Sequence, residues 1–582
     1  MSLNTDLAVA DLVILAGFFG VMLAIGLYYA NRMKDLKDFF SGGRQVPWWV
    51  SGISLYMTTF SAFTFIAYSA LAYQYGMVAI TIWWFSVPAC LFSAYFLAAR
   101  WRRAVTTSPL EYIETRFGPS LRQGFSWIGL PLIIIDDGLK LFVIGKMVTV
   151  SLGIQFEHGL TLSIVVCGAI ILAYTFLGGL WAVMITDVIQ FVIVAVAVLV
   201  LAPLAVGRAG GLTTLLESLP PEFAHPVGGT YTWPWLIAFG VLLLLTYATK
   251  WPYVQRYYSV SSDRDARKVG YLVAAFMLFG PPLLFLPALA AKVFMPGIAN
   301  PNDVYPLLCR ELLPAGMIGV IIAAMFSATM SMLSSDYNAG ASVITNDIVK
   351  RQFAPHLSER GLLLTGRYAT LLIGALALGI ALYLANAQTM EDLVNYMAQL
   401  FSVLMPPVAI PMMAGLLTRS ASNRGALAAF VTGTVCGVTA YMLSYHNIPG
   451  GESLKFLRDV QWLTWISGVP TAAVLLVVSM LAPDSPRRIE EITQFLSGLT
   501  GKERPAKEAF DEGGDATVAV RIIGLASASL GAIMMVAVLA SVPFQEARLS
   551  IMVGAFLVLF GCVLAACARR ILHPSSAHEE GN

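Results

Sequence analysis

Seven charged side chains lie well inside apolar stretches of the sequence, where burying a charge in lipid is costly and therefore indicates a functional site. They are Asp136, Asp137, Lys140, Lys146, Asp187, Lys250 and Asp336. Asp136 and Lys140 are four residues apart, so on a helix they share one face and can neutralise each other. This spacing fits a structural ion pair as well as a functional one.

Lys250 lies two residues before Pro252, within the run Thr246-Tyr-Ala-Thr-Lys-Trp-Pro-Tyr. Proline removes a helical hydrogen bond and frees backbone carbonyls. Inside a membrane, broken helices are tolerated only where they line a cavity or are buried in protein. We therefore expect a broken helix at Lys250. The alternative is that Lys250 extends to the inner membrane surface, because Arg256 follows six residues later.

A third candidate site is a run of hydroxyl side chains that ends at Asp336. Its members are Ser327, Thr329, Ser331, Ser334 and Ser335. Three of them, Ser331, Ser334 and Ser335, share one helical face. Oxygen ligands suit a hard cation such as Na+, so we expect ion coordination here. Hydroxyls that bond to their own helix or join two helices are the alternative.

Membrane-spanning helices must hold these residues, because 58% of the chain is apolar and only 12% is charged. Soluble domains have about 45–50% apolar and about 25% charged residues. Lys plus Arg (36) nearly balance Asp plus Glu (34), so no nucleic-acid partner is expected. Stretches of about 20 apolar residues predict an all-α polytopic protein with fifteen spans. These are roughly 8–30, 46–75, 77–99, 126–153, 159–178, 181–207, 231–255, 269–294, 313–349, 362–386, 391–417, 423–444, 463–482, 518–541 and 547–571.

Lys and Arg gather in alternate connecting segments, starting with the one that contains Arg32 and Arg44. Such residues are retained on the cytoplasmic side, which predicts an N-terminus outside and a C-terminus, after Arg569 and Arg570, inside. The first apolar run is long enough to span, so no cleavable signal peptide is expected.

Four ordered motifs resemble the solute:sodium symporter family, which includes sodium/glucose, proline and sialic acid transporters. The resemblance covers about residues 8 to 445. The motifs are Phe39-Phe-Ser-Gly-Gly-Arg44 with Pro47-Trp-Trp, Gly178-Gly-Leu-Trp-Ala-Val-Met-Ile-Thr-Asp187-Val-Ile-Gln, Val254-Gln-Arg256 and Ser342-Val-Ile-Thr-Asn-Asp-Ile.

The resemblance implies a leucine-transporter-type fold, in which two inverted five-helix repeats enclose a site at the membrane midplane. One extra helix would precede the repeats and four would follow them. The implied divisions are an N-terminal span (8–30), a first repeat (46–207), a second repeat (231–417), two extra spans (423–482), a cytoplasmic linker (483–517) and two C-terminal spans (518–571).

The resemblance also implies two sodium positions. The main one would use the carbonyls of Met57, Phe60 and Ala328 and the hydroxyl of Ser331. Its remaining hydroxyl position holds Met332, whose thioether is a poor ligand for a hard cation. The second would combine Asp187 with Ser331, Ser334 and Ser335. A gate or helix-end residue is the alternative role for Asp187.

For the solute, the implied contacts match sialic acid carriers better than sugar carriers. Thr59, Ser61 and Thr64 match the hydroxyls on the broken helix, Trp83 matches an aromatic in the next span, and Lys140 stands in place of an Arg that binds a carboxylate. Sugar carriers have Glu, Asn, Gln and Lys where this chain has Trp83, Thr59, Thr64 and Leu278.

The family does not explain Lys250 and Asp336. Lys250 could supply a second cation for an anionic solute, or it could pair with Asp336 as a proton-coupling element. Tyr253 is a candidate solute contact and inner gate, with an interfacial aromatic as the alternative.

Taken together, the residues and the resemblance predict a secondary active transporter of the bacterial inner membrane. It would couple Na+ to a small polar, anionic solute, such as a sialic-acid-like sugar acid or another carboxylate, by alternating access. We expect a monomer in lipid with no organic cofactor. An enzyme is not expected, because the six histidines show no metal or triad spacing. The alternatives are a proton-coupled or uncoupled carrier and a transporter-like sensor.

Overall fold

The computed structural model describes residues 9–30, 44–104, 108–151, 154, 156–314, 316–387, 393–445, 451–500, 514–566 and 568. These residues are almost entirely helical, and within them only two isolated β-bridges occur, Val46 with Val260 and Gly228 with Tyr231. The all-α prediction is confirmed.

Twelve stretches of the described chain are long and apolar enough to cross a membrane, and two bent helix pairs also qualify. The twelve lie in α1 (Val9–Ala30), the segment from α5 (Val78–Trp84) through α6 (Ser86–Phe92) and η2 (Ser93–Leu97) to α7 (Ala98–Ala104), both halves of α10 (Gly159–Arg208), α14 (Asp263–Phe294), α16 (Met317–Val343) with η5 (Ile344–Phe353), α17 (Glu359–Ala387), α18 (Leu393–Leu417), α19 (Asn423–Tyr445), α20 (Val460–Leu481), α22 (Gly514–Ser541) and α23 (Phe544–Ala566).

One further long helix, α9 (Pro119–Ser151), carries four of the seven intramembrane charges. Its 33 residues would extend about 50 Å at about 1.5 Å per residue, which is enough to cross a bilayer. It is the candidate for a fifteenth span, and the count of fifteen stays a prediction. The short helices are α8 (Glu111–Phe117), α11 (Leu212–Ser218), η3 (Pro221–Ala224), η4 (Pro301–Asp303), α15 (Val304–Leu312), η6 (Gly451–Arg458) and α21 (Pro486–Thr500).

Two helices are broken, and each is the first helix of a predicted repeat. α3 (Trp48–Met57) and α4 (Ala62–Tyr75) meet at 59°, and α12 (Trp233–Thr249) and α13 (Trp251–Tyr258) meet at 46°. Paired breaks at corresponding places in two repeats are typical of inverted-repeat transporters.

Local sequence explains both breaks. Ser61 caps α4, where its backbone and side chain form a capping box with Thr64. Pro252 lies in the first turn of α13, where its missing N–H does no harm. Lys250 is extended (φ −60°, ψ 126°) and separates α12 from α13. The predicted break at Lys250 is therefore confirmed.

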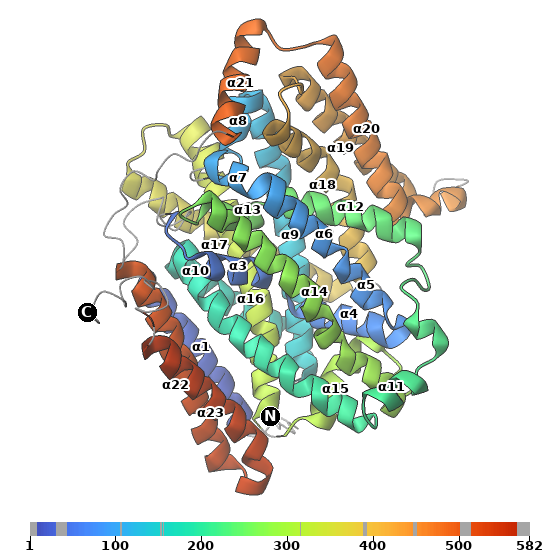
Figure 1. Ribbon diagram of the computed structural model, residues 1–582, viewed down its shortest axis with the longest axis vertical. Helices are drawn as coiled ribbons and strands as arrows, with labels where there is room; N and C mark the ends of the chain where they lie inside the picture. The colour runs from blue at the N-terminus through green and yellow to red at the C-terminus, as the bar shows by residue number, and fades with distance from the viewer. Residues whose placement is uncertain are drawn as a thin grey trace, which may run out of the picture.

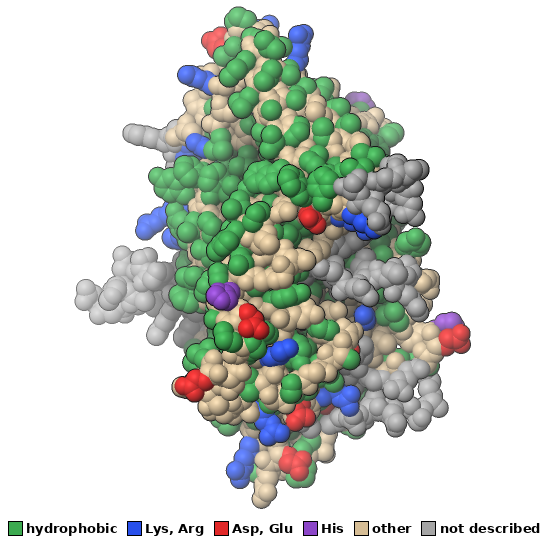
Figure 2. All heavy atoms as spheres, turned by 90° about the vertical axis from the view of Figure 1, so that its right-hand side faces the viewer, with side chains coloured by type: hydrophobic (Ala, Val, Ile, Leu, Met, Phe, Trp, Pro, Cys, Tyr) green, Lys and Arg blue, Asp and Glu red, His purple; other side chains and the backbone are tan. Residues whose placement is uncertain are grey.

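The centre of the molecule is α16, which is almost wholly buried between α9, α10, α1 and α17. The C-terminal pair α22 and α23 packs beside α1 at one edge, while α19 and α20 pack with α18 at another (Figure 1). Figure 2 shows a broad apolar stretch across the upper half of one face, with most charged side chains above and below it. Such a surface suits lipid.

Some predictions fall outside the described residues. These are the loop cation Arg32, residues 39–43 of the first motif, residues 501–513 of the linker, and Arg569 and Arg570. The rest of the linker is not featureless, since α21 forms within it and contacts α7, α8 and α18.

Candidate functional site

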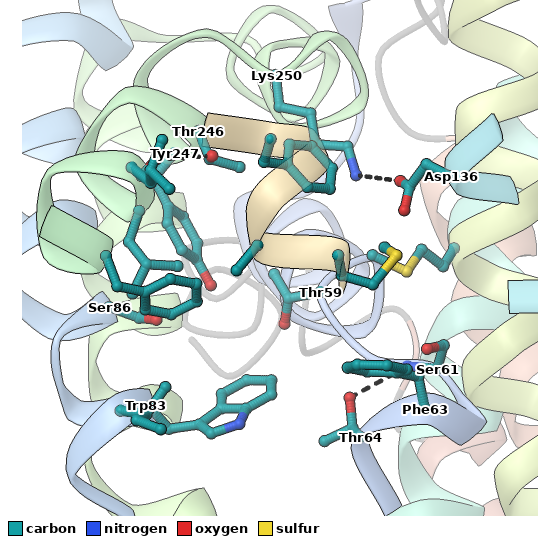
Figure 3. Close-up of a pocket in the computed structure, with 18 of the residues that line it drawn as sticks. Thr59, Ser61, Phe63, Thr64, Trp83, Ser86, Asp136, Thr246, Tyr247 and Lys250 are labelled. Atoms are coloured by element: carbon teal, nitrogen blue, oxygen red, sulfur yellow. Dashed lines mark hydrogen bonds and ion pairs between the residues drawn. The ribbon is translucent and has the colours of Figure 1, made fainter. Parts of the chain in front are cut away.

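A cavity of about 160 Å³ lies between the two broken helices (Figure 3). Its walls come from the break between α3 and α4, from α5, α9 and α18, and from the break between α12 and α13. All seven predicted solute residues line it: Thr59, Ser61, Thr64, Trp83, Lys140, Lys250 and Tyr253. The structure therefore brings together residues from four separate parts of the chain.

One side of the cavity is aromatic. Trp83 stacks on Phe60, with ring centroids 5.2 Å apart, and meets Tyr68 edge-on at 5.4 Å. The Nε1 of Trp83 is buried and has no hydrogen-bond partner among the described residues. Since an indole N–H can only donate, this wall offers a free donor to an acceptor group on a solute.

Two hydroxyls on the broken helix have hydrogen-bond partners within the protein, Thr59 as a donor and Thr64 as an acceptor. Thr59 Oγ1 donates to the Tyr56 carbonyl at 2.6 Å, and the Ser61 backbone N–H donates to Thr64 Oγ1 at 3.5 Å. A hydroxyl keeps lone pairs when it donates, so Thr59 can still accept a hydrogen bond from a solute.

Lys140 lies at the centre of a buried charge cluster, which we define as Asp136, Asp137, Lys140, Lys250 and Asp336. Its Nζ lies 2.7 Å from Asp136 Oδ2, 3.0 Å from Asp137 Oδ1 and 2.7 Å from Asp336 Oδ2. An ammonium has three donors, so the three carboxylates take all of them. Lys140 therefore has no donor left for a solute carboxylate, and Lys250 fits the role predicted for Lys140 better.

Lys250 is the more loosely held cation of the charge cluster. Its Nζ lies 3.4 Å from Asp136 Oδ2 and 3.7 Å from Asp336 Oδ2. It also lies 5.5 Å from the ring centroids of Tyr253 and Phe401, which places the ammonium over aromatic faces. The predicted Lys250–Asp336 contact is thus present, and Lys250 also faces the cavity (Figure 3).

The charge cluster has an excess of acceptors. By formal charge, three carboxylates outnumber two ammoniums, and one oxygen of each aspartate is buried without a partner among the described residues. Of the three aspartates, Asp136 lines the cavity. Lys146, on the same helix, is exposed and takes no part in the charge cluster.

A smaller cavity of about 40 Å³ shares Asp136, Lys250 and Phe401 with the first. Its other lining residues include Gly129, which is nearer the start of α9 than Asp136, and Met405, which is nearer the end of α18 than Phe401. The Asp136–Lys250 ion pair and the Phe401 ring therefore stand between two cavities.

Asp187 lies in a second buried polar site, which contains an arginine that we did not predict as a site residue. Asp187 Oδ2 accepts a hydrogen bond from Ser54 Oγ at 2.5 Å and lies 3.5 Å from Arg256 Nη2. Arg256 Nη2 donates to Ser335 Oγ at 2.6 Å, and its Nε donates to Ser54 Oγ at 3.0 Å. Arg256 belongs to the motif Val254-Gln-Arg256, but its position just after the predicted span 231–255 suggested the membrane surface. The structure buries it completely.

The oxygens left over around Asp187 fit a sodium ion. Asp187 Oδ1 and Ser331 Oγ are both buried and make no hydrogen bond within the described part of the chain. Of the other predicted ligands, Ser334 donates to the Ser331 carbonyl at 3.1 Å, and Ser335 binds Arg256. Orphaned carboxylate and hydroxyl oxygens are the donor set that a hard cation prefers.

At the main sodium position the fit is weaker. Met57, Phe60 and Ala328 are all buried near the break in the first repeat, and the Met57 carbonyl accepts from the Phe60 N–H at 3.1 Å. Met332 lines the solute cavity. Its sulfur is a soft atom in a place where an oxygen would serve Na+ better.

Comparisons with known proteins identify the family of the chain. The profile of the sodium:solute symporter family matches residues 39–433. The sodium/sialic acid symporter of Aliivibrio fischeri is 28% identical over 444 residues, which cover 71% of this chain and 84% of that protein. The sodium/glucose cotransporter of Vibrio parahaemolyticus is 27% identical over 505 residues, which cover 78% of this chain and 87% of that protein.

A solved structure of a Na+-coupled sialic acid symporter, in a substrate-bound outward-open state, matches the fold with a TM-score of 0.71. It is 22% identical and covers 81% of this chain and 98% of its own. The match supports the leucine-transporter-type fold that the paired helix breaks indicate. Because the family profile spans more than half of its length, the chain belongs to the sodium:solute symporter family.

Proposed function

We propose that this protein is a secondary active transporter that couples Na+ influx to the uptake of a small organic solute bearing a carboxylate. The observation that carries the proposal is the cavity that residues from both helix breaks line. Solute sites of inverted-repeat transporters lie between broken helices, and rocking of one repeat against the other opens them to each side in turn.

The cavity supports a solute of limited size. Its volume of about 160 Å³ is below the range of about 300–1,000 Å³ for pockets that hold drug-sized ligands. We therefore favour a small carboxylate over a solute as large as a sialic acid. Lys250 receives the carboxylate, because Lys140 has no donor left, and Trp83 Nε1 supplies a second donor.

Sodium is the second cargo. Asp187 and Ser331 hold it through their unpartnered oxygens, with Ser334 beside them. Bound Na+ can drive transport only by binding one conformation more tightly than the other. Helix α16 carries Ser331 in this site and Met332 in the solute cavity, which links the two sites through adjacent residues.

A carrier that is proton-coupled or uncoupled is the second candidate. Two observations favour it: the Arg256 guanidinium already neutralises Asp187, and Met332 replaces an oxygen at the main sodium position. A sodium requirement for solute binding separates the two candidates.

We further propose that the protein works as a monomer in the inner membrane of a bacterium. The proposal is supported by a cavity formed within one chain and by bacterial relatives.

A thermal-shift screen tests the proposal. Purified protein is heated with organic acids, amino acids, sugars and polyols, in sodium chloride and in choline chloride. We expect a carboxylate to raise the melting temperature only in sodium. Lys250→Met should abolish that shift, whereas Lys146→Met, which removes an exposed lysine outside the charge cluster, should retain it. A shift by neutral sugars alone, or one equal in both salts, would contradict the proposal.

A further inference from the structure

We propose that the solute is a zwitterion, whose ammonium group binds Asp136 while its carboxylate binds Lys250, so that it takes the place of the ion pair between these two residues. The inference rests on the proposed function and names the chemical class of its solute. Three observations support it, two from the wall that the charge cluster presents to the cavity and one from the wall that contains Trp83.

First, the Asp136–Lys250 contact is the one in the charge cluster that can be exchanged. At 3.4 Å it is longer than the 2.7–3.0 Å contacts that hold Lys140. Charge-assisted hydrogen bonds are normally about 2.7–2.9 Å long. Lys250 can therefore turn to a solute carboxylate while Lys140 keeps the three aspartates together.

Second, Asp136 presents an unmet acceptor to the solute. Its Oδ1 has no partner among the described residues, its side chain is 2% exposed, and it lines the cavity. An ionised carboxylate can only accept hydrogen bonds, and leaving one unpaired in a buried site is costly. A solute with only a carboxylate would bring a negative charge to this oxygen, which the site rejects.

Third, Trp83 on the opposite wall needs a hydrogen-bond acceptor from the same solute. Trp83 Nε1 is a buried donor without a partner, and Lys250 faces the same space. A solute with only an ammonium group would leave the Trp83 N–H without an acceptor and would be repelled by the Lys250 ammonium. A molecule that carries both groups satisfies the neighbouring Asp136 and Lys250 at one end of the cavity and offers an acceptor toward Trp83 at the other (Figure 3).

The exchange has a structural consequence, because the ion pair stands between the two cavities. The smaller cavity shares Asp136, Lys250 and Phe401 with the larger one. In the orientation that the loop charges predict, with the N-terminus outside, its residues Gly129 and Met405 lie toward the cytoplasm. A zwitterion that binds both Asp136 and Lys250 breaks the ion pair that separates the two cavities.

The test is a matched series of ligands with the full-length protein in sodium chloride. Each neutral α-amino acid is compared with the carboxylic acid that lacks its amino group and with the amine that lacks its carboxylate. For alanine these are propionate and ethylamine, and for valine they are 3-methylbutanoate and isobutylamine. We expect at least one amino acid to bind at least about tenfold more tightly than both partners of its series, as measured by calorimetry.

Asp136→Asn should reduce that preference over the deaminated acid to less than about threefold, because the amide offers a donor and no charge. Asp137→Asn is the matched control, because Asp137 also binds Lys140 but does not line the cavity, and the preference should persist. Melting temperatures report whether each variant is folded.

The outcomes separate the two proposals. Deaminated acids that bind as well as their amino acids, or the absence of binding by any amino acid, overturn the zwitterion and leave sodium-coupled carboxylate transport intact. Failure of every carboxylate, with or without an amino group, to bind in sodium overturns the proposed function itself.

Discussion

Replacing Arg256 with Met should leave the buried Asp187 carboxylate without its cation, so that it binds sodium more tightly. The Arg256 guanidinium is fully buried, lies 3.5 Å from Asp187 Oδ2, and binds the hydroxyls of Ser54 and Ser335. Two unit charges 3.5 Å apart attract by about 5 kcal/mol at an effective dielectric of about 20. Because burial of the guanidinium offsets part of this, we expect a loss near the range of about 3–5 kcal/mol for breaking a buried pair.

Sodium should restore much of the loss in this variant. With Arg256 gone, Asp187 keeps its full charge for a cation, and a ligand at about 100 times its Kd stabilises the native state by about 2.7 kcal/mol. The assay is thermal unfolding of purified protein in sodium chloride and in choline chloride at equal ionic strength. The sodium-dependent rise in melting temperature should be larger for Arg256→Met than for the parent protein.

Two controls make the test decisive. Arg256→Met combined with Asp187→Asn removes both charges, so it should regain stability in choline and lose the enlarged response to sodium. Arg256→Lys keeps the charge without the planar fork and should lie between the parent and Arg256→Met. If Arg256→Met is as stable as the parent in choline, the stability assigned to the ion pair is refuted. If it responds to sodium no more than the parent, the assignment of sodium to Asp187 is refuted.

Three further variants probe other parts of the structure. Met332→Ser should lower the sodium concentration needed for half-maximal uptake, because an oxygen replaces the sulfur at the main sodium position; an unchanged value would mean that this position does not bind sodium. Trp83→Phe keeps the stack on Phe60 but loses the free N–H, so solute affinity should fall about tenfold with little change in melting temperature; equal affinity would remove Trp83 Nε1 from the site. Gly561→Ala places a Cβ against the Gly524 carbonyl, where α22 and α23 are in close contact, and should cost about 1–3 kcal/mol of stability; a fully stable variant would show that the two helices can move apart.

The sequence allowed much of this architecture to be predicted, because membrane spans and helix breaks have local causes. Pro252 alone indicated where the helix of the second repeat would break, and the structure has that break at Lys250. The i, i+4 spacing of Asp136 and Lys140 likewise predicted an ion pair, and their side chains lie 2.7 Å apart.

Convergence of distant side chains could not be predicted in the same way. Lys140 and Asp336 are 196 positions apart in the chain, and only the packing of α16 against α9 brings them to 2.7 Å. Arg256 was misjudged for a related reason: its place near the end of a span suggested the membrane surface. The bend between α12 and α13 instead turns the last part of that span into the protein interior, where Asp187 needs a cation.

The central claim is that a sodium gradient drives accumulation of the solute. The most direct measurement uses proteoliposomes loaded with potassium and diluted into sodium, with the solute from the binding screen supplied in radiolabelled form. We predict accumulation above the external concentration, which collapses when a sodium ionophore dissipates the gradient and is lost in Asp187→Asn. Accumulation that persists without a sodium gradient but disappears with a protonophore would contradict the account.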